Sequence, residues 1–197
     1  MKLIKLTGFI LSRKPFGEFD RTLAVFSHEY GLVRIMAKGI RKIKSVRSFH
    51  TDLINHVRME IEQSGNGERC ANYLREVSTL ENHTIMKQSP KLFSSACLIA
   101  AFLLRTLPHD SPQKEIFELT EKTFKALNRK EEPEIKEILQ NYFLKTIKQM
   151  GYMPNKVPRD QMREMLWKTL RDLDPQLTLQ ARLTLGIFSN FESTSSN

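Results

Sequence analysis

Positive charge gathers around one glycine in the segment VRIMAKGIRKIKS, residues 33–45. Residues 31–51 contain six Lys or Arg and neither Asp nor Glu: Arg34, Lys38, Arg41, Lys42, Lys44 and Arg47. A field of one sign attracts a polyanion and releases its condensed counterions. Gly39 would let a phosphate approach the backbone, and Ser45 and Ser48 would donate to phosphate oxygens. The segment predicts a phosphate-binding loop; the alternative is a solvated basic run that only aids solubility.

Further cations and aromatic rings flank this segment. The additional cations are Arg13, Lys14 and Arg21, and the aromatic side chains are Phe16, Phe19, Tyr30 and Phe49. A fixed basic groove with rings for base stacking is a common way to bind a single nucleic-acid strand. Packing in the core or at its rim is the alternative role for each ring. Because no base-specific code is visible, we expect sequence-independent contacts with the backbone.

The remaining polar residues predict neither a metal centre nor a bound cofactor. The five histidines lack metal-ligand spacing, and no nucleotide-binding glycine loop or nucleophile elbow is present. Cys70 and Cys97 suggest two reduced thiols. Glu18 and Asp20 have the spacing of two residues on one strand face and could hold Mg²⁺ in a nuclease. We favour salt bridges from these acids to neighbouring arginines or lysines, and therefore expect no catalytic residue.

The charge balance of the whole chain also favours an anionic partner. The 197 residues carry 31 Lys or Arg and 22 Asp or Glu, a formal net charge of +9. Met1 to Leu11 does not resemble a cleavable signal sequence, which suggests a cytoplasmic location. The apolar run Leu92 to Leu104 is shorter than the roughly 20 residues of a membrane span and predicts a buried helix.

Strand patterns dominate the first eighty residues. Apolar and β-branched runs predict strands over 3–12 and 21–27, and Gly31 predicts a hairpin leading into a further strand. Residues 53–61 alternate as in a strand, whereas 70–80 fit either a fifth strand or a first helix. Four to five short strands bury their apolar faces best in a closed barrel or sandwich, for example an OB-like barrel.

Helix patterns follow. Ser89-Pro90, Ser111-Pro112 and Pro133 are predicted to open three helices, the third ending at Gly151. A fourth is predicted over 162–173, and residues 177–185 after Asp174-Pro175 fit a helix or a strand. The predicted fold class is therefore α+β, with an N-terminal OB-fold β-barrel (1–80) followed by an all-α helical domain (81–197).

Residues 8–45 resemble the N-terminal domain of the bacterial recombination mediator RecO family. The shared pattern consists of Pro15, Gly17, Glu18 and Asp20, the Gly31 hairpin, Ala-Lys-Gly-x-Arg at 37–41, and Ser45. Residues 141–155 are similar to the family's helix that ends in Gly-Tyr-x-Pro. Many members continue there with a four-cysteine zinc ribbon, whereas this chain continues without cysteine. The chain thus looks like a short, zinc-free member.

The resemblance implies a non-enzymatic mediator that binds single- and double-stranded DNA and anneals complementary strands. It implies RecR and the acidic tail of single-strand-binding protein as partners, and RecA indirectly. Lys38 and Arg41 fall on the family's basic segment. We therefore expect DNA contacts from Lys38, Arg41, Lys42, Lys44 and Arg47, with Arg13, Lys14, Arg21 and Arg34 as a second group. An RNA-binding module on the same barrel is the alternative, distinguished by competition between DNA and RNA oligomers.

Overall fold

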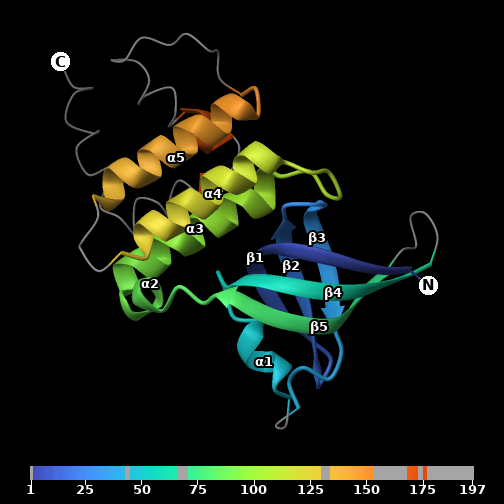
Figure 1. Ribbon diagram of the computed structural model, residues 1–197. Coiled ribbons are helices and arrows are strands. Elements are labelled where there is room, and N and C mark those ends of the chain that lie inside the picture. The colour runs from blue at the N-terminus through green and yellow to red at the C-terminus, as the bar shows by residue number, and fades with distance from the viewer. Residues whose placement is uncertain are drawn as a thin grey trace, which may run out of the picture. The chain divides into compact units, whose positions relative to one another are not determined.

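Five strands close into a barrel in the order β1-β2-β3-β5-β4 (Figure 1). They are β1 (Lys2–Phe16), β2 (Asp20–Ser27), β3 (Gly31–Ala37), β4 (His56–Ser64) and β5 (Ala71–Glu81). β3 pairs with β5 in parallel, and the other four described pairings are antiparallel. With the short helix α1 (Arg47–His50) between β3 and β4, this is the predicted OB-fold barrel. The computed structural model describes residues 2–42, 45–65, 71–129, 134–152, 168–172 and 175–176.

Apolar side chains at alternate positions along the strands fill the barrel interior. On β2, Leu23 and Val25 are fully buried, and on β3 Ile35 and Ala37 face the same interior. Side chains of a strand point to opposite faces in turn, so each strand contributes every second residue to one apolar core. The rest of that core comes from Val33 on β3, from the other strands and from the segment after β3: Leu6, Ile10, Ile40, Val57, Met59, Ile61 and Leu74.

Some of the predicted local elements differ from those in the structure. Residues 71–81 form a strand because β4 and β3 each supply an edge with which β5 pairs, which periodicity along the chain cannot reveal. β4 begins at His56 rather than Leu53, since Ile54 turns the chain with φ +66° and buries its side chain. The helix α1 was not predicted, because four residues are too few to show a helical period.

Four named helices follow β5 among the described residues. They are α2 (Thr84–Gln88), α3 (Pro90–Thr106), α4 (Lys114–Leu127) and α5 (Ile135–Gln149). Ser89 caps α3 as predicted, its Oγ accepting from the Leu92 N–H at 3.4 Å, and Gly151 ends α5 with φ +77°. Residues 168–172 are helical, whereas the rest of the predicted span 162–173 and residues 177–185 lie outside the described residues. No described helix combines the length and the apolar character that crossing a membrane requires.

The chain divides into two compact units. The first joins Met1–His83 with Thr106–Phe117, and the second joins Thr84–Arg105 with Glu118–Asn197. In the first unit the Phe117 ring packs on Phe9 at 5.2 Å. In the second, the buried Tyr142 hydroxyl lies 2.9 Å from Thr120 Oγ1, and burial raises the pKa of Tyr142. The α+β class is confirmed; the predicted domain boundary after residue 80 stays a prediction.

Candidate nucleic-acid interface

Three hydrogen bonds bring the β1–β2 turn and the segment after β3 to one end of the barrel. The Gly39 N–H donates to Asp20 Oδ1 at 2.7 Å, and the Arg41 N–H donates to the Phe19 carbonyl at 2.9 Å. The Arg41 guanidinium donates to the Gly17 carbonyl at 3.1 Å. These segments lie beside α1 in Figure 1. We call residues 17–19, 38–42 and 45–50 together the basic end.

The basic segment is anchored to the barrel at Ile40. This side chain is fully buried in the apolar core, whereas its neighbours Lys38, Arg41 and Lys42 are exposed. The Lys42 N–H donates to the Gly39 carbonyl at 3.2 Å, which closes a turn that Gly39 enters with φ +65°. The backbone that carries the three exposed cations is therefore fixed, as the sequence suggested for a loop following a barrel strand.

Gly39 has a structural role in this turn. Its N–H is engaged by the Asp20 carboxylate, so a phosphate could bind that N–H only by displacing Asp20. The prediction that Glu18 and Asp20 share one face of a strand is wrong, because Glu18 lies in the turn before β2 begins. Salt bridges from these acids to neighbouring arginines or lysines stay a prediction; Arg13, one of those neighbours, pairs with Asp52. Among the described residues, no group of three or more His, Cys, Asp or Glu could hold a metal ion.

Aromatic rings lie next to two of the exposed lysines. Lys38 Nζ lies 4.4 Å from the centre of the Tyr73 ring, and Lys42 Nζ lies 5.8 Å from that of Phe19. Cation–π attraction at such distances keeps a flexible lysine near its ring. Tyr73 was missed from the sequence because the 70–80 stretch was not assigned to a strand. The parallel pairing of Met36 with Tyr73 brings it to this end.

Arg47 differs from the other predicted DNA-binding residues. Its guanidinium donates to the backbone carbonyls of Lys38 at 3.2 Å, Arg75 at 3.3 Å and Leu74 at 3.5 Å. The side chain thus ties α1 to β5 and to the basic segment, which makes Arg47 a positioning residue as well as a predicted contact. Lys44, also predicted as a contact, lies outside the described residues.

The second group of cations divides between the two faces of the sheet. Lys14 pairs with Thr22, and Arg34 pairs with Ala24, so both point outward from β1 and β3. Arg13 pairs with Leu23, and Arg21 shares the Leu23 face of β2, so both lie at the end of the barrel interior. Lys14 and Arg34 therefore belong to the outer surface of β1–β3, and Arg13 and Arg21 to the barrel end.

The four candidate stacking rings are exposed rather than buried. Phe49 is 82% exposed, Phe16 56%, Phe19 50% and Tyr30 37%, so none of the four is buried in the core, and packing at its rim stays the alternative role. Tyr30 lies in the β2–β3 turn, at the end of these strands opposite the basic end. Phe16, Phe19 and Phe49 remain candidates for base stacking next to the cations.

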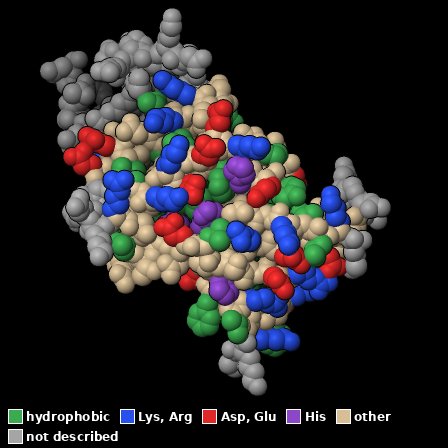
Figure 2. Space-filling view, viewed as in Figure 1, with side chains coloured by type: hydrophobic (Ala, Val, Ile, Leu, Met, Phe, Trp, Pro, Cys, Tyr) green, Lys and Arg blue, Asp and Glu red, His purple; other side chains and the backbone are tan. Residues whose placement is uncertain are grey.

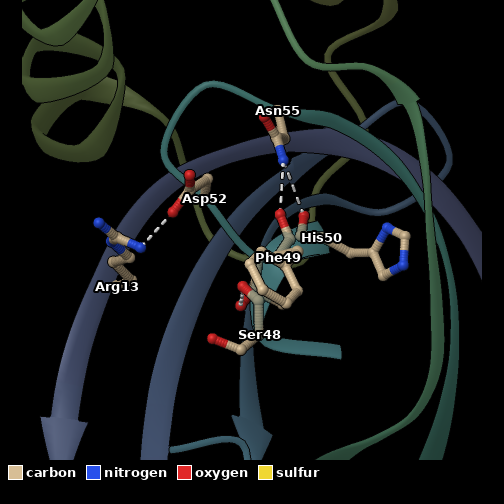
Figure 3. A network of polar contacts seen from close by, with 7 residues as sticks. Arg13, Ser48, Phe49, His50, Asp52 and Asn55 are labelled. Carbon is tan, nitrogen blue, oxygen red and sulfur yellow. Dashed lines mark hydrogen bonds and ion pairs between the residues drawn. The ribbon is translucent and has the colours of Figure 1, made fainter. Parts of the chain in front are cut away.

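Polar contacts hold the backbone that carries Phe49 (Figure 3). Asn55 Nδ2 donates to the His50 carbonyl at 3.0 Å and to the Phe49 carbonyl at 3.4 Å. His50 Nδ1 lies 2.9 Å from Thr79 Oγ1 on β5. An exposed phenyl ring on a backbone fixed in this way loses little conformational freedom when a base stacks on it.

The β4–β5 face of the barrel has a different character. Figure 2 shows Lys and Arg side chains interspersed with Asp and Glu side chains over this part of the molecule. Lys5 and Arg58 line a shallow pocket there together with Glu60 and Glu76, and Lys5 Nζ lies 3.9 Å from Glu60. Opposite charges at this spacing offset each other, so this face lacks the excess of cations found at the basic end.

Comparison with known proteins agrees with the architecture. The family model described as "Recombination protein O N terminal" matches residues 1–82, and "Recombination protein O C terminal" matches residues 88–156. A DNA repair protein RecO from Trichodesmium erythraeum is 29% identical over 118 residues, covering 60% of this chain and 40% of the relative. One from Desulfitobacterium hafniense (strain DSM 10664 / DCB-2) is 29% identical over 151 residues, covering 76% and 52%.

A third relative, the DNA repair protein RecO of Cyanothece sp., is 25% identical over 150 residues and is covered over 50% of its length. The chain thus spans about half the length of the curated relatives that it matches. An asparaginyl-tRNA synthetase structure from Entamoeba histolytica aligns with a TM-score of only 0.36, which supports no argument. With the two family models matching the barrel and the helices in order, the chain belongs to the recombination protein O (RecO) family.

Proposed function

We propose that this protein is a DNA-binding mediator of recombinational repair that holds the phosphate backbone at the basic end. The observation that carries the proposal is the set of exposed cations Lys38, Arg41 and Lys42 on a turn anchored by the buried Ile40. A fixed cationic surface binds phosphates without reading sequence, which suits a protein that must act on any damaged DNA. OB-folds commonly bind oligonucleotides on strands 2 and 3 and the β1–β2 loop. The turn that carries these residues follows β3 directly and is hydrogen-bonded to Gly17, Phe19 and Asp20 at the β1–β2 connection.

The finer roles in the proposal come from the family. Neutralising the phosphates of two complementary strands lets them approach each other, so annealing needs no catalytic residue. Assistance to RecA on DNA coated with single-strand-binding protein would involve RecR and the acidic tail of that protein. A bacterial DNA substrate implies a cytoplasmic location. Lys44 and Arg47, and on the outer strand face Lys14 and Arg34, are proposed as additional contacts.

The salt dependence of DNA binding tests the proposal directly. If about four phosphates of a single strand are neutralised, the affinity should fall ~50-fold between 50 and 200 mM salt, with a slope of roughly −0.7 per contact. Fluorescence anisotropy with a labelled oligonucleotide of mixed sequence measures this slope. An affinity that hardly changes with salt would contradict backbone binding and with it the proposed function.

Phe49 should give the protein a preference for single strands. Stacking of an unpaired base on an aromatic ring contributes about 1–3 kcal/mol. We therefore expect Phe49→Ala to weaken single-strand binding roughly 5- to 150-fold while leaving duplex binding nearly unchanged, because duplex bases already stack on each other. Tyr30→Ala is the matched control, since Tyr30 is exposed at the opposite end of β2 and β3. Equal losses on both kinds of DNA would show that Phe49 does not stack on bases.

A further inference from the structure

Arg21 lies on the face of β2 that points to the barrel interior, at a position where the apolar residues of that face give way to a charged one. It precedes Leu23 and Val25 on the inward face of β2, and its neighbours across the sheet are Pro15 on β1 and Ala37 on β3. The side chain is partly buried, and its Nη1 is covered without a hydrogen-bond partner among the described residues. A covered guanidinium donor with no acceptor is unfavourable, so its presence calls for an explanation.

Like charges surround this guanidinium. Burial is the largest cause that lowers the pKa of Arg21, and the charges of Arg13 and then Arg41 lower it further, whereas Asp52 acts in the opposite direction. Asp52 is itself paired with Arg13 (Figure 3). We call these four residues the barrel mouth. By this definition it holds three guanidinium groups and one carboxylate, an excess of two positive charges.

The cations of the barrel mouth are held near one another by the fold. Arg41 is fixed by its guanidinium bond to the Gly17 carbonyl and by its backbone bond to Phe19. Arg13 is fixed by its ion pair with Asp52 in the segment after α1. The planar N–H groups of arginine match phosphate oxygens in a bidentate manner and remain charged in proteins. Inorganic phosphate or a phosphate group of DNA has the charge and acceptors to offset this excess.

We propose that the barrel mouth is a binding site for one phosphate group, with Arg21 as its central ligand and Arg13 and Arg41 beside it. The inference rests on the proposed function only for the source of the phosphate, which would be a DNA strand. Inorganic phosphate would bind the same groups. The barrel mouth shares Arg41 with the basic end but not Lys38 and Lys42, which are proposed to contact a backbone without enclosing any one phosphate.

Calorimetric titration of inorganic phosphate into the full chain, against chloride at equal ionic strength, tests the site. Saturable binding is expected, weakened roughly 10-fold or more in Arg21→Gln through loss of a charge-assisted hydrogen bond. Arg21→Lys should be intermediate, because it keeps the charge without the planar fork. Arg58→Gln removes one exposed arginine from the β4–β5 face and should bind phosphate as the wild type does.

Thermal unfolding separates this role from a purely structural one. Without phosphate at low salt, Arg21→Gln should be at least as stable as the wild type, since it relieves repulsion from Arg13 and Arg41. Phosphate should then raise the melting temperature of the wild type more than that of Arg21→Gln. A structural arginine would instead give a variant that is less stable in both conditions, and that result would overturn the proposal.

Oligonucleotides with a 5′-phosphate or a 5′-hydroxyl identify the source. If Arg21→Gln weakens the binding of both oligonucleotides equally, the barrel mouth binds a phosphate within the strand. If only the oligonucleotide with a 5′-phosphate binds more weakly, the barrel mouth binds that terminal phosphate. If Arg21→Gln weakens the binding of inorganic phosphate but not that of DNA, free phosphate is the ligand, and the proposed phosphate site is still supported. Equal phosphate binding by wild type and Arg21→Gln overturns the site, even where the wild type binds DNA normally.

Discussion

Replacing Lys38 and Arg41 together with alanine is expected to weaken DNA binding roughly 30-fold near 100 mM salt, at about 1 kcal/mol for each lost phosphate contact. Both side chains are exposed on the turn anchored by Ile40, so their removal should leave the barrel folded. Because phosphate contacts carry no sequence information, all sequences should lose affinity alike. The salt slope for a single strand should also become shallower by about 1.4, twice the contribution of one contact.

Lys5→Ala combined with Arg58→Ala is the matched control for that variant. It removes the same formal charge from the chain, but from the β4–β5 face, where Glu60 and Glu76 lie close to both residues. We expect it to change affinity by less than about threefold, since only the long-range field of the protein is altered. Equal losses in the two double variants would show that net charge, rather than the basic end, governs binding.

Gly31→Ala is expected to have the largest effect on stability, lowering the free energy of unfolding by roughly 2–5 kcal/mol. A Cβ atom at this position would lie 2.0 Å from the Ser111 backbone carbonyl oxygen, and φ is +74°. Two effects destabilise the variant. The added methyl group would overpack against the Ser111 backbone, which cannot rotate away, and the left-handed conformation at residue 31 is unfavourable for any residue with a side chain. Urea unfolding followed by circular dichroism measures the change.

Gly17→Ala separates these two effects. Gly17 also has a positive φ, +58°, but a Cβ there would meet nothing within 4 Å. The free energy of unfolding of the Gly17→Ala variant should fall by only about 1–2 kcal/mol. The difference between the two variants reports the clash with Ser111, and therefore whether Thr106–Phe117 packs on the β2–β3 hairpin in solution. Similar losses of unfolding free energy in both variants would mean that Thr106–Phe117 shifts away from residue 31 at little energetic cost.

The main elements of the barrel could be predicted because their patterns are local. The alternation that buries Leu23 and Val25 has a period of two residues, and Gly31 is a residue that readily enters the left-handed turn. The helix α3 was likewise visible from Ser89-Pro90 and its apolar run. In contrast, β5 could not be assigned, because its strand identity depends on pairing with β4 and β3 rather than on its own residues.

The candidate site shows the same division. The density of positive charge in residues 31–51 is a property of the chain, and so is the apolar residue Ile40 that interrupts it. The use of Arg47 as a bridge to three carbonyls is not, since those acceptors come from distant segments. Nor could the position of Tyr73 beneath Lys38 be foreseen, because it follows from the parallel β3–β5 pairing.

The order of residues along the chain was thus enough for the fold class, the family resemblance and the location of the basic segment. These depend on periodicity, turn chemistry and charge density, which neighbouring residues set among themselves. The folded barrel was needed to show that Arg13 and Arg21 share the strand face of Leu23 at the barrel end, while Lys14 and Arg34 share the outer face. A side chain's face depends on strand register and on the bulge between Ile10 and Ser12, and register is set by contacts between strands far apart in sequence.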